Sequence, residues 1–94
     1  MRRLAIIFSP QCPANVYFID KIREWAEPYG VDVKVINAFE DQERARTFLT
    51  RTRVGFDRHM FITVFIDDRW IPGHPGNPKF KQDLLKELGG SEDG

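Results

Sequence analysis

The first thirteen residues constrain the fold more than any other part of the chain. Residues 4–8 (Leu-Ala-Ile-Ile-Phe) form a continuous apolar run, which is typical of a strand buried on both faces of a sheet. Ser9 and Pro10 end the run, and Pro13 suits the first turn of a helix. If a second strand follows this helix, the two strands are predicted to pair in parallel through a crossover connection.

The next segments supply that helix and that strand. Apolar residues at helical spacing predict a helix that begins at Pro13 and ends before Pro28. Its inward stripe is predicted to contain Val16, Ile19, Ile22 and Ala26. Alternating residues over 31–36 then predict a second strand, less buried than the first. Few apolar residues occur over 40–53, where we expect a short, well-exposed helix.

The C-terminal half predicts a hairpin and a last helix. Two β-rich runs, 61–66 and 69–71, are separated by Asp67-Asp68, a pattern typical of a tight antiparallel hairpin. After a proline-rich loop over 72–78, Asn77 can cap a helix that begins at Pro78 and ends at Gly89-Gly90. The predicted order is therefore β-α-β-α-β-β-α, an α/β fold with a four-stranded mixed sheet.

Length and charge bound the function. Ninety-four residues, 41% of them apolar, suffice for one core and not for two, so we expect a single domain over residues 1–90 and a disordered tail over 91–94. Fourteen basic residues balance fourteen acidic ones, which gives no net field toward nucleic acid or a membrane surface. The apolar run near the N-terminus is too short for a secretory signal, and no run has the length of a membrane helix. A single cysteine does not indicate an oxidising compartment, and we expect a cytoplasmic protein without nucleic-acid or membrane partners.

Cys12 is the only cysteine, and it stands directly before Pro13. At a helix N-terminus, unpaired backbone N–H groups and the positive end of the helix dipole favour a thiolate over a thiol. One cysteine cannot form an internal disulfide, so any chemistry of Cys12 requires a second molecule. Cys12 is therefore either a nucleophile that forms mixed disulfides or an inert structural cysteine.

Two motifs resemble the thioredoxin fold and, within it, the glutaredoxin branch. Residues 8–15 (Phe-Ser-Pro-Gln-Cys-Pro-Ala-Asn) resemble the glutaredoxin active-site turn, in which Cys-Pro-Tyr-Cys follows a strand ending in Phe-Thr. Residues 64–73 (Val-Phe-Ile-Asp-Asp-Arg-Trp-Ile-Pro-Gly) resemble the second signature, a strand reading Ile-Phe-Ile-Asp-Gly followed by a short strand and a Gly-Gly pair. The resemblance covers nearly the whole chain. It implies a thioredoxin-like fold and thiol–disulfide exchange through Cys12 with glutathione or a protein thiol.

The departures from the family pattern bear on activity. Asn15 stands where the family has its resolving cysteine, and Ile62 stands near the position of the cis-proline that closes the active site. The lysine that commonly precedes the turn is absent, whereas Gly73 keeps the second glycine of the Gly-Gly pair. The resemblance thus implies a monothiol cycle through Cys12, resolved by an external thiol. The alternative is a non-catalytic module that binds a protein or a small ligand across the former active-site face.

The resemblance also implies a set of ligand contacts. The candidate ligand-binding residues are Pro13, Asn15, Ile62, Thr63, Gly73 and His74. In glutaredoxins the loop that corresponds to 72–78 binds the γ-glutamyl end of glutathione. Here the start of the last helix would offer the N–H groups of Lys79 and Phe80 to an anion; the alternative is a rigid proline-rich connector. No cofactor other than glutathione or a similar small thiol is expected, because the Cys-Gly-Phe-Ser turn of cluster-binding glutaredoxins is absent.

Histidines and arginines complete the candidates. His59 and His74 lie in loops next to the predicted hairpin strands, and either is a base for Cys12 or an ordinary loop histidine. Together with Cys12 they lack the paired spacing of a zinc signature, so no metal is predicted. Five arginines cluster in and after the second helix, at positions 44, 46, 51, 53 and 58. They form either a binding patch for phosphate, for glutathione carboxylates or for an acidic partner, or a solvated face with ion pairs such as Glu40–Arg44.

Overall fold

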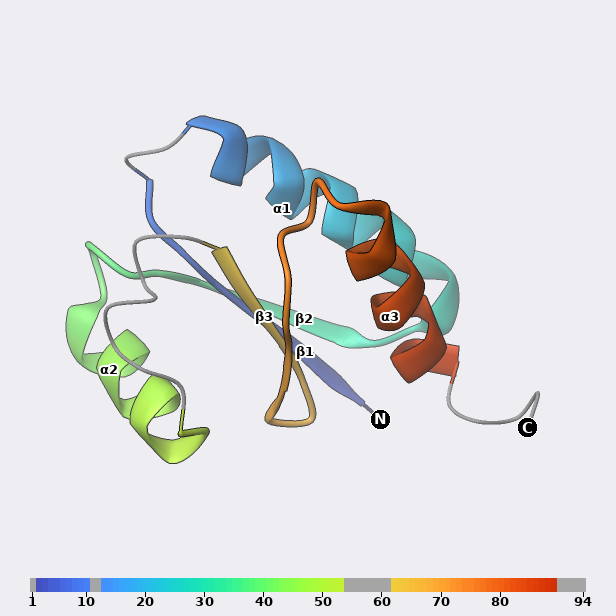
Figure 1. Cartoon of the computed structure of the whole chain (residues 1–94). Coiled ribbons are helices and arrows are strands. Elements are labelled where there is room, and N and C mark those ends of the chain that lie inside the picture. Colours follow the sequence, from blue (N-terminus) through green and yellow to red (C-terminus); the bar gives the residue numbers. More distant parts are fainter. Residues whose placement is uncertain (1, 11–12, 54–61, 90–94) are drawn as a thin grey trace.

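Four strands form one mixed sheet in the order β2-β1-β3-β4 (Figure 1). The computed structural model describes residues 2–10, 13–53 and 62–89. Along the chain the elements are β1 (Arg3–Phe8), α1 (Pro13–Ala26), the 3₁₀ turn η1 (Glu27–Tyr29), β2 (Asp32–Asn37), α2 (Gln42–Arg51), β3 (Ile62–Ile66), β4 (Arg69–Ile71) and α3 (Pro78–Gly89). The predicted order and the α/β class with a four-stranded mixed sheet are confirmed. The tail over 91–94 lies outside the described residues.

The predicted parallel pairing of the first two strands and the predicted antiparallel hairpin are both present. β1 pairs in parallel with β2 and antiparallel with β3, and β3 pairs antiparallel with β4. β1 is thus a central strand, and every residue from Leu4 to Phe8 is buried. Asp67 and Asp68 form the tight turn of the β3–β4 hairpin with positive φ angles of 50° and 68°, which aspartate tolerates better than most residues.

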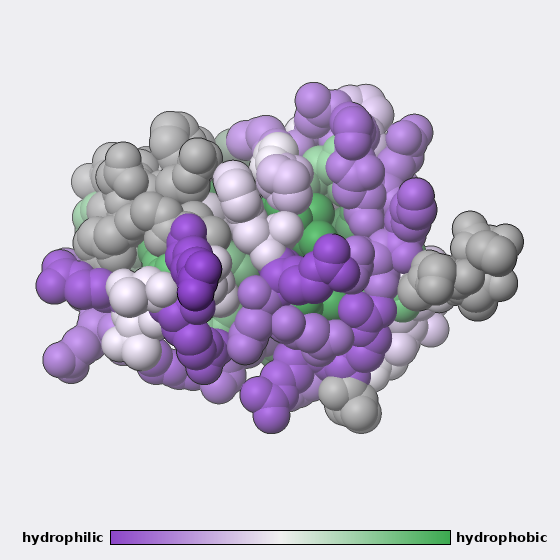
Figure 2. Space-filling view, turned by 60° about the horizontal axis from the view of Figure 1, so that its bottom comes forward, coloured by the Kyte–Doolittle hydropathy of each residue, from purple (hydrophilic) through white to green (hydrophobic). Residues whose placement is uncertain are grey.

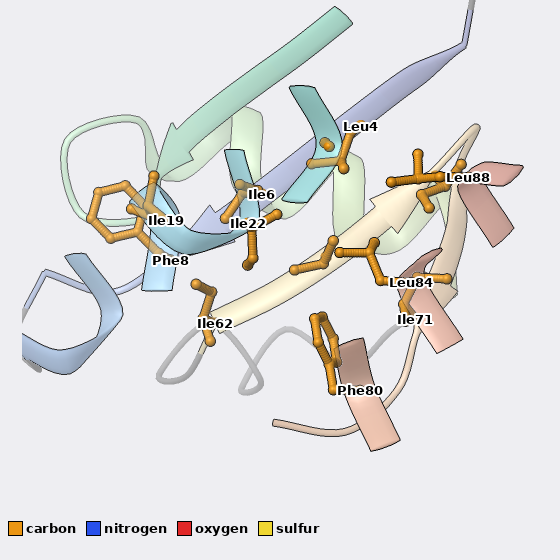
Figure 3. Close-up of a cluster of buried hydrophobic side chains, with 13 residues drawn as sticks. Leu4, Ile6, Phe8, Ile19, Ile22, Ile62, Ile71, Phe80, Leu84 and Leu88 are labelled. Atoms are coloured by element: carbon orange, nitrogen blue, oxygen red, sulfur yellow. The ribbon is translucent and has the colours of Figure 1, made fainter. Parts of the chain in front are cut away.

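Helices cover both faces of the sheet. α1 and α3 lie on one face and α2 lies on the other (Figure 1). Because side chains alternate along a strand, Leu4 and Ile6 of β1 join the core beneath α1 and α3, whereas Ala5 and Ile7 join the core beneath α2. Figure 3 shows the larger core, in which side chains of β1, β3 and β4 meet those of α1 and α3.

The inward stripe of α1 differs from the predicted one. Its buried residues are Asn15, Ile19, Ile22 and Ala26. The prediction for Val16 was wrong, since this side chain is 50% exposed. Positions 15, 19, 22 and 26 keep helical spacing, so Asn15 takes the inward place and Val16 points away from the sheet.

α2 begins later than the sequence pattern predicts. The side-chain oxygen of Asn37 accepts hydrogen bonds from the N–H groups of Phe39 and Glu40 at 2.8 and 3.1 Å, which holds these residues in a turn before the helix. Arg44 pairs with Asp41 at 3.1 Å instead of with Glu40. Ala45 and Leu49 are the buried residues of this otherwise exposed helix.

α3 begins as predicted. The side-chain oxygen of Asn77 accepts a hydrogen bond from the N–H group of Lys79 at 2.9 Å, and Pro78 is the first helical residue. Its buried stripe consists of Phe80, Leu84 and Leu88. Among the helices of the described ranges, none combines the length and the apolar character needed to cross a bilayer.

Candidate functional site

The candidate site lies at the carboxyl end of β1. Phe8, the last residue of β1, is beside Asn37 of β2 and Ile62 of β3. Cys12, the predicted nucleophile, lies outside the described residues. The described residues on either side of positions 11–12, Pro10 and Pro13, are both exposed.

The start of α1 gives the site its electrostatic character. The helix begins at Pro13, as predicted, so Cys12 directly precedes its first turn. That turn contains no acidic residue, so no carboxylate of its own opposes the positive end of the helix dipole. This arrangement stabilises negative charge at the helix N-terminus, typically by about 0.3–1 kcal/mol at an exposed position.

Asn15 connects the two described segments that flank Cys12, the end of β1 and the start of α1. Its side-chain amide is buried and donates a hydrogen bond to the backbone oxygen of Ser9 at 2.7 Å. Ser9 itself is 1% exposed. The contact, called here the Asn15–Ser9 brace, joins the chain before Cys12 to the helix after it. Asn15 was predicted as a ligand contact and this role was missed, because the predicted inward stripe began at Val16; the only signal was that position 15 also has helical spacing to Ile19 and Ile22.

Ile62 and Thr63 point to opposite faces of the sheet. Ile62 is opposite Phe8 and belongs to the core beneath α1 and α3. The Thr63 hydroxyl donates to the backbone oxygen of Ile7 at 3.2 Å, and its side chain is buried. The structure therefore brings Ile62 to the same end of the sheet as the cysteine turn, whereas the Thr63 hydroxyl is engaged within the fold.

The loop over 72–77 packs against α1. The ring of His74 meets the ring of Phe18 edge to face, with centroids 5.2 Å apart. Its Nδ1 atom accepts a hydrogen bond from the Gly76 N–H group at 2.9 Å, so the proton of the neutral ring is on Nε2. Gly73 has a positive φ of 103°, which only glycine adopts readily. His59, the second candidate base, lies outside the described residues.

The prediction of free N–H groups at the start of α3 was wrong. The Lys79 N–H group donates to the side chain of Asn77, and the Phe80 N–H group donates to its backbone oxygen, both at 2.9 Å. The Asn77 N–H group is likewise bonded to the His74 oxygen at 2.8 Å. The loop thus satisfies these N–H groups internally, which favours the rigid connector over an anion-binding loop.

Exposed apolar side chains surround this end of the molecule. Val16 is 50% exposed and Tyr17 is 57% exposed on the first half of α1. Phe39, which follows the carboxyl end of β2, is 38% exposed. The ring centroids of Tyr17 and Phe18 are 5.1 Å apart, and Phe18 in turn contacts His74, so an aromatic surface extends from Tyr17 to His74. Tyr17 was not among the predicted site residues, and its position next to the inward stripe was the only signal for it.

The described arginines of the predicted cluster belong to another region, and Arg58 lies outside the described residues. A hollow of about 820 Å³ lies between α2 and the sheet, lined by cations such as Arg44 and Arg51 and by acids such as Asp41 and Asp68. Arg51 pairs with Asp68 at 3.1 Å, so part of the positive charge is neutralised.

Figure 2, with the bottom of Figure 1 turned forward, shows mainly hydrophilic side chains and hydrophobic ones only in recesses. Within the described ranges, no group of three or more His, Cys, Asp and Glu side chains is arranged to hold a metal ion.

Comparisons with known proteins find no match to this chain, whether with family models, with curated proteins or with solved structures. Any functional inference therefore depends on the residues and the geometry of the chain itself.

Proposed function

We propose that this chain is a glutaredoxin-like protein with a thioredoxin fold, in which Cys12 carries out monothiol thiol–disulfide exchange. The observation that carries the proposal is the start of α1 at Pro13, directly after Cys12, with no acidic residue in the first turn. The sheet order β2-β1-β3-β4, with α2 on one face and α1 and α3 on the other, supports the fold assignment. The reducing cytoplasm is the compartment that suits this chemistry.

The reaction proceeds by two exchanges. The Cys12 thiolate attacks the glutathione sulfur of a mixed disulfide between glutathione and a protein, and the protein leaves as a thiolate. A new S–S bond then joins Cys12 to glutathione. The thiolate of a second glutathione attacks the glutathione sulfur of this bond, which releases Cys12 and glutathione disulfide. The substrate disulfide is thereby reduced, and two glutathione molecules end as one disulfide.

The described residues support particular parts of this cycle. Asn15 holds the turn in place through Ser9, and its amide cannot attack the mixed disulfide as a resolving cysteine would. Ile62 lies at the same end of the sheet, where its backbone is a candidate contact for an extended substrate. Gly73 and His74 belong to a loop in which the N–H groups of Gly76 and Asn77 are engaged, so we propose that the His74 side chain contributes to binding there.

The decisive measurement is the pKa of Cys12, obtained from thiolate absorbance or from the alkylation rate as a function of pH. We expect a value well below the free value of about 8.5 and ready formation of a glutathione mixed disulfide. Wild-type protein should then reduce a glutathionylated peptide with glutathione, and the Cys12→Ser variant should not. A thiol pKa at or above the free value, with slow alkylation, would overturn the redox proposal.

The second candidate is a non-catalytic binding module, which the exposed Val16 and Tyr17 favour. Exposed aromatic residues are typical of partner surfaces. In this case, binding of a partner isolated with the wild-type protein should survive Cys12→Ser and be lost in Tyr17→Ser. Because Tyr17 is more than half exposed, that variant should fold like the wild type.

A further inference from the structure

One edge of the sheet is open to pairing with another strand. β2 is an outer strand, because the sheet order places only β1 beside it. The Asp32 N–H group donates to the Arg2 oxygen, and the Ala38 N–H group donates to the Phe8 oxygen. Since the backbone direction alternates along a strand, the peptide groups of Asp32, Lys34 and Ile36 face β1, and those of Val33 and Val35 face outward. An edge of this kind is a template for another strand.

The side chains of this edge separate into a charged face and an apolar face. Asp32 and Lys34 are exposed on the side of α2, where they line the large hollow. Within the described residues, neither of them forms an ion pair. Val31, Val33 and Val35 lie on the other side, half-buried against the core beneath α1 and α3.

We propose that a second copy of this chain pairs with β2, antiparallel and symmetric about Val33. In this register the outward peptide groups of Val33 bond those of Val33 in the second copy, and Val35 bonds Val31. Asp32 is then opposite Lys34 of the second copy, and Lys34 is opposite its Asp32. These two pairs fall at non-hydrogen-bonded positions, where side chains on opposite strands approach most closely.

The charge pattern selects this register. A shift of the symmetry centre to Lys34 places lysine opposite lysine, which is unfavourable. A shift to Val35 places Lys34 opposite Ile36 and leaves both charges without a cross-strand ion pair. Of these three registers, symmetry about Val33 alone satisfies both charges, and it does so with two identical strands. A self-complementary edge fits a second copy of the chain, because an unrelated antiparallel strand would need the same Asp-x-Lys pattern along its own sequence.

The apolar side supports the same arrangement. The three valines of each copy form one continuous strip across the join, and β-branched side chains suit such cross-strand contacts. A hollow of about 430 Å³ between α1 and β2 is lined by Val31 and Val33, so their surface is accessible in the single chain. Pairing removes part of this apolar surface from water.

The test is the oligomeric state of charge-swapped variants. Sedimentation equilibrium at low ionic strength should show a wild-type dimer. Asp32→Lys and Lys34→Glu should each weaken the dimer by about tenfold or more, because each variant sets like charges opposite one another twice. The double variant Asp32→Lys with Lys34→Glu should restore the dimer. An equimolar mixture of the two single variants should form a heterodimer, since the two lysines of one strand then face the two carboxylates of the other.

Glu40→Lys is the matched control, because it makes the same change in net charge as Asp32→Lys at an exposed position outside β2. It should leave the dimer intact. Circular dichroism should show that all the variants fold, since the substituted side chains are exposed. A wild-type monomer at high protein concentration would overturn the proposal. The proposal would also fail if the double variant and the mixture of single variants stayed monomeric. Neither result depends on the chemistry of Cys12.

Discussion

The two ends of β1 are held in different ways. At its carboxyl end, a buried hydrogen bond of 2.7 Å from the Asn15 amide to the Ser9 oxygen connects the strand to the start of α1. At its amino end, Arg2 contacts Asp67 of the hairpin at 2.8 Å and the backbone oxygens of Glu87 and Leu88 of α3. The side-chain hydrogen bonds described at the first end, from Asn15 to Ser9 and from Thr63 to Ile7, are buried, whereas those at the second end are more exposed.

This difference distinguishes the candidate site, at the carboxyl end of β1, from the structural contacts at its amino end. The contacts at the amino end are redundant, because the Arg3 N–H group also binds Asp67 at 3.0 Å and Arg69 also pairs with Glu87 at 3.1 Å. Loss of one partner leaves another in place. At the carboxyl end, the Asn15–Ser9 hydrogen bond is buried and joins the end of β1 to the first turn of α1. A change at Asn15 should therefore affect both the stability of the fold and the reactivity of Cys12.

The largest effect is expected for Asn15→Ala. Removal of the amide leaves the buried Ser9 oxygen without this donor, a change that typically costs about 1–3 kcal/mol. Urea unfolding should show this loss, and the alkylation rate of Cys12 should change because the turn is no longer braced. The exposed neighbour variant Ala14→Ser is the control and should alter neither quantity by much. An Asn15→Ala protein with wild-type stability and wild-type alkylation kinetics would contradict the proposed brace.

A smaller effect is expected for Arg2→Ala. This change removes a cation from the last carbonyls of α3 and an exposed ion pair with Asp67, which together contribute about 1 kcal/mol. Urea unfolding should show a loss below that of Asn15→Ala. Alkylation of Cys12 should be unchanged, since Arg2 is at the other end of the strand. If Arg2→Ala destabilises more than Asn15→Ala, the contrast between the two ends is wrong.

The elements were predictable because each has a local signal. Alternation in 31–36, the Asp67-Asp68 turn and the Asn77 cap each depend on residues close together in the sequence, and the structure contains all three features. Details of the site depend on contacts between residues that are distant in the sequence, or on a small rotation of a helix about its own axis. Val16 and Asn15 differ by one helical step, so periodicity alone did not decide which of them faces inward. The engaged N–H groups at the start of α3 required the geometry of the loop.

The smallest effect is expected for Asp67→Asn, and it depends on pH. The hydrogen bond from the Arg3 N–H group, followed by that from the Arg2 side chain, holds the pKa of Asp67 below its ordinary value of 3.8. Because the folded pKa is the lower one, the charge stabilises the fold above the unfolded value, and this contribution is lost as pH falls through the folded pKa. Asparagine preserves the shape of the side chain and tolerates the positive φ of this turn.

At neutral pH, Asp67→Asn should therefore lower the free energy of unfolding by less than about 1 kcal/mol, as expected for an exposed ion pair. The difference from wild type should shrink as the pH is lowered below about 4 and disappear once the wild-type carboxyl is protonated. Urea unfolding of both proteins between neutral and strongly acidic pH measures this directly. A difference that stays constant over the whole pH range would mean that shape, and not charge, is what Asp67 contributes to the amino end of β1.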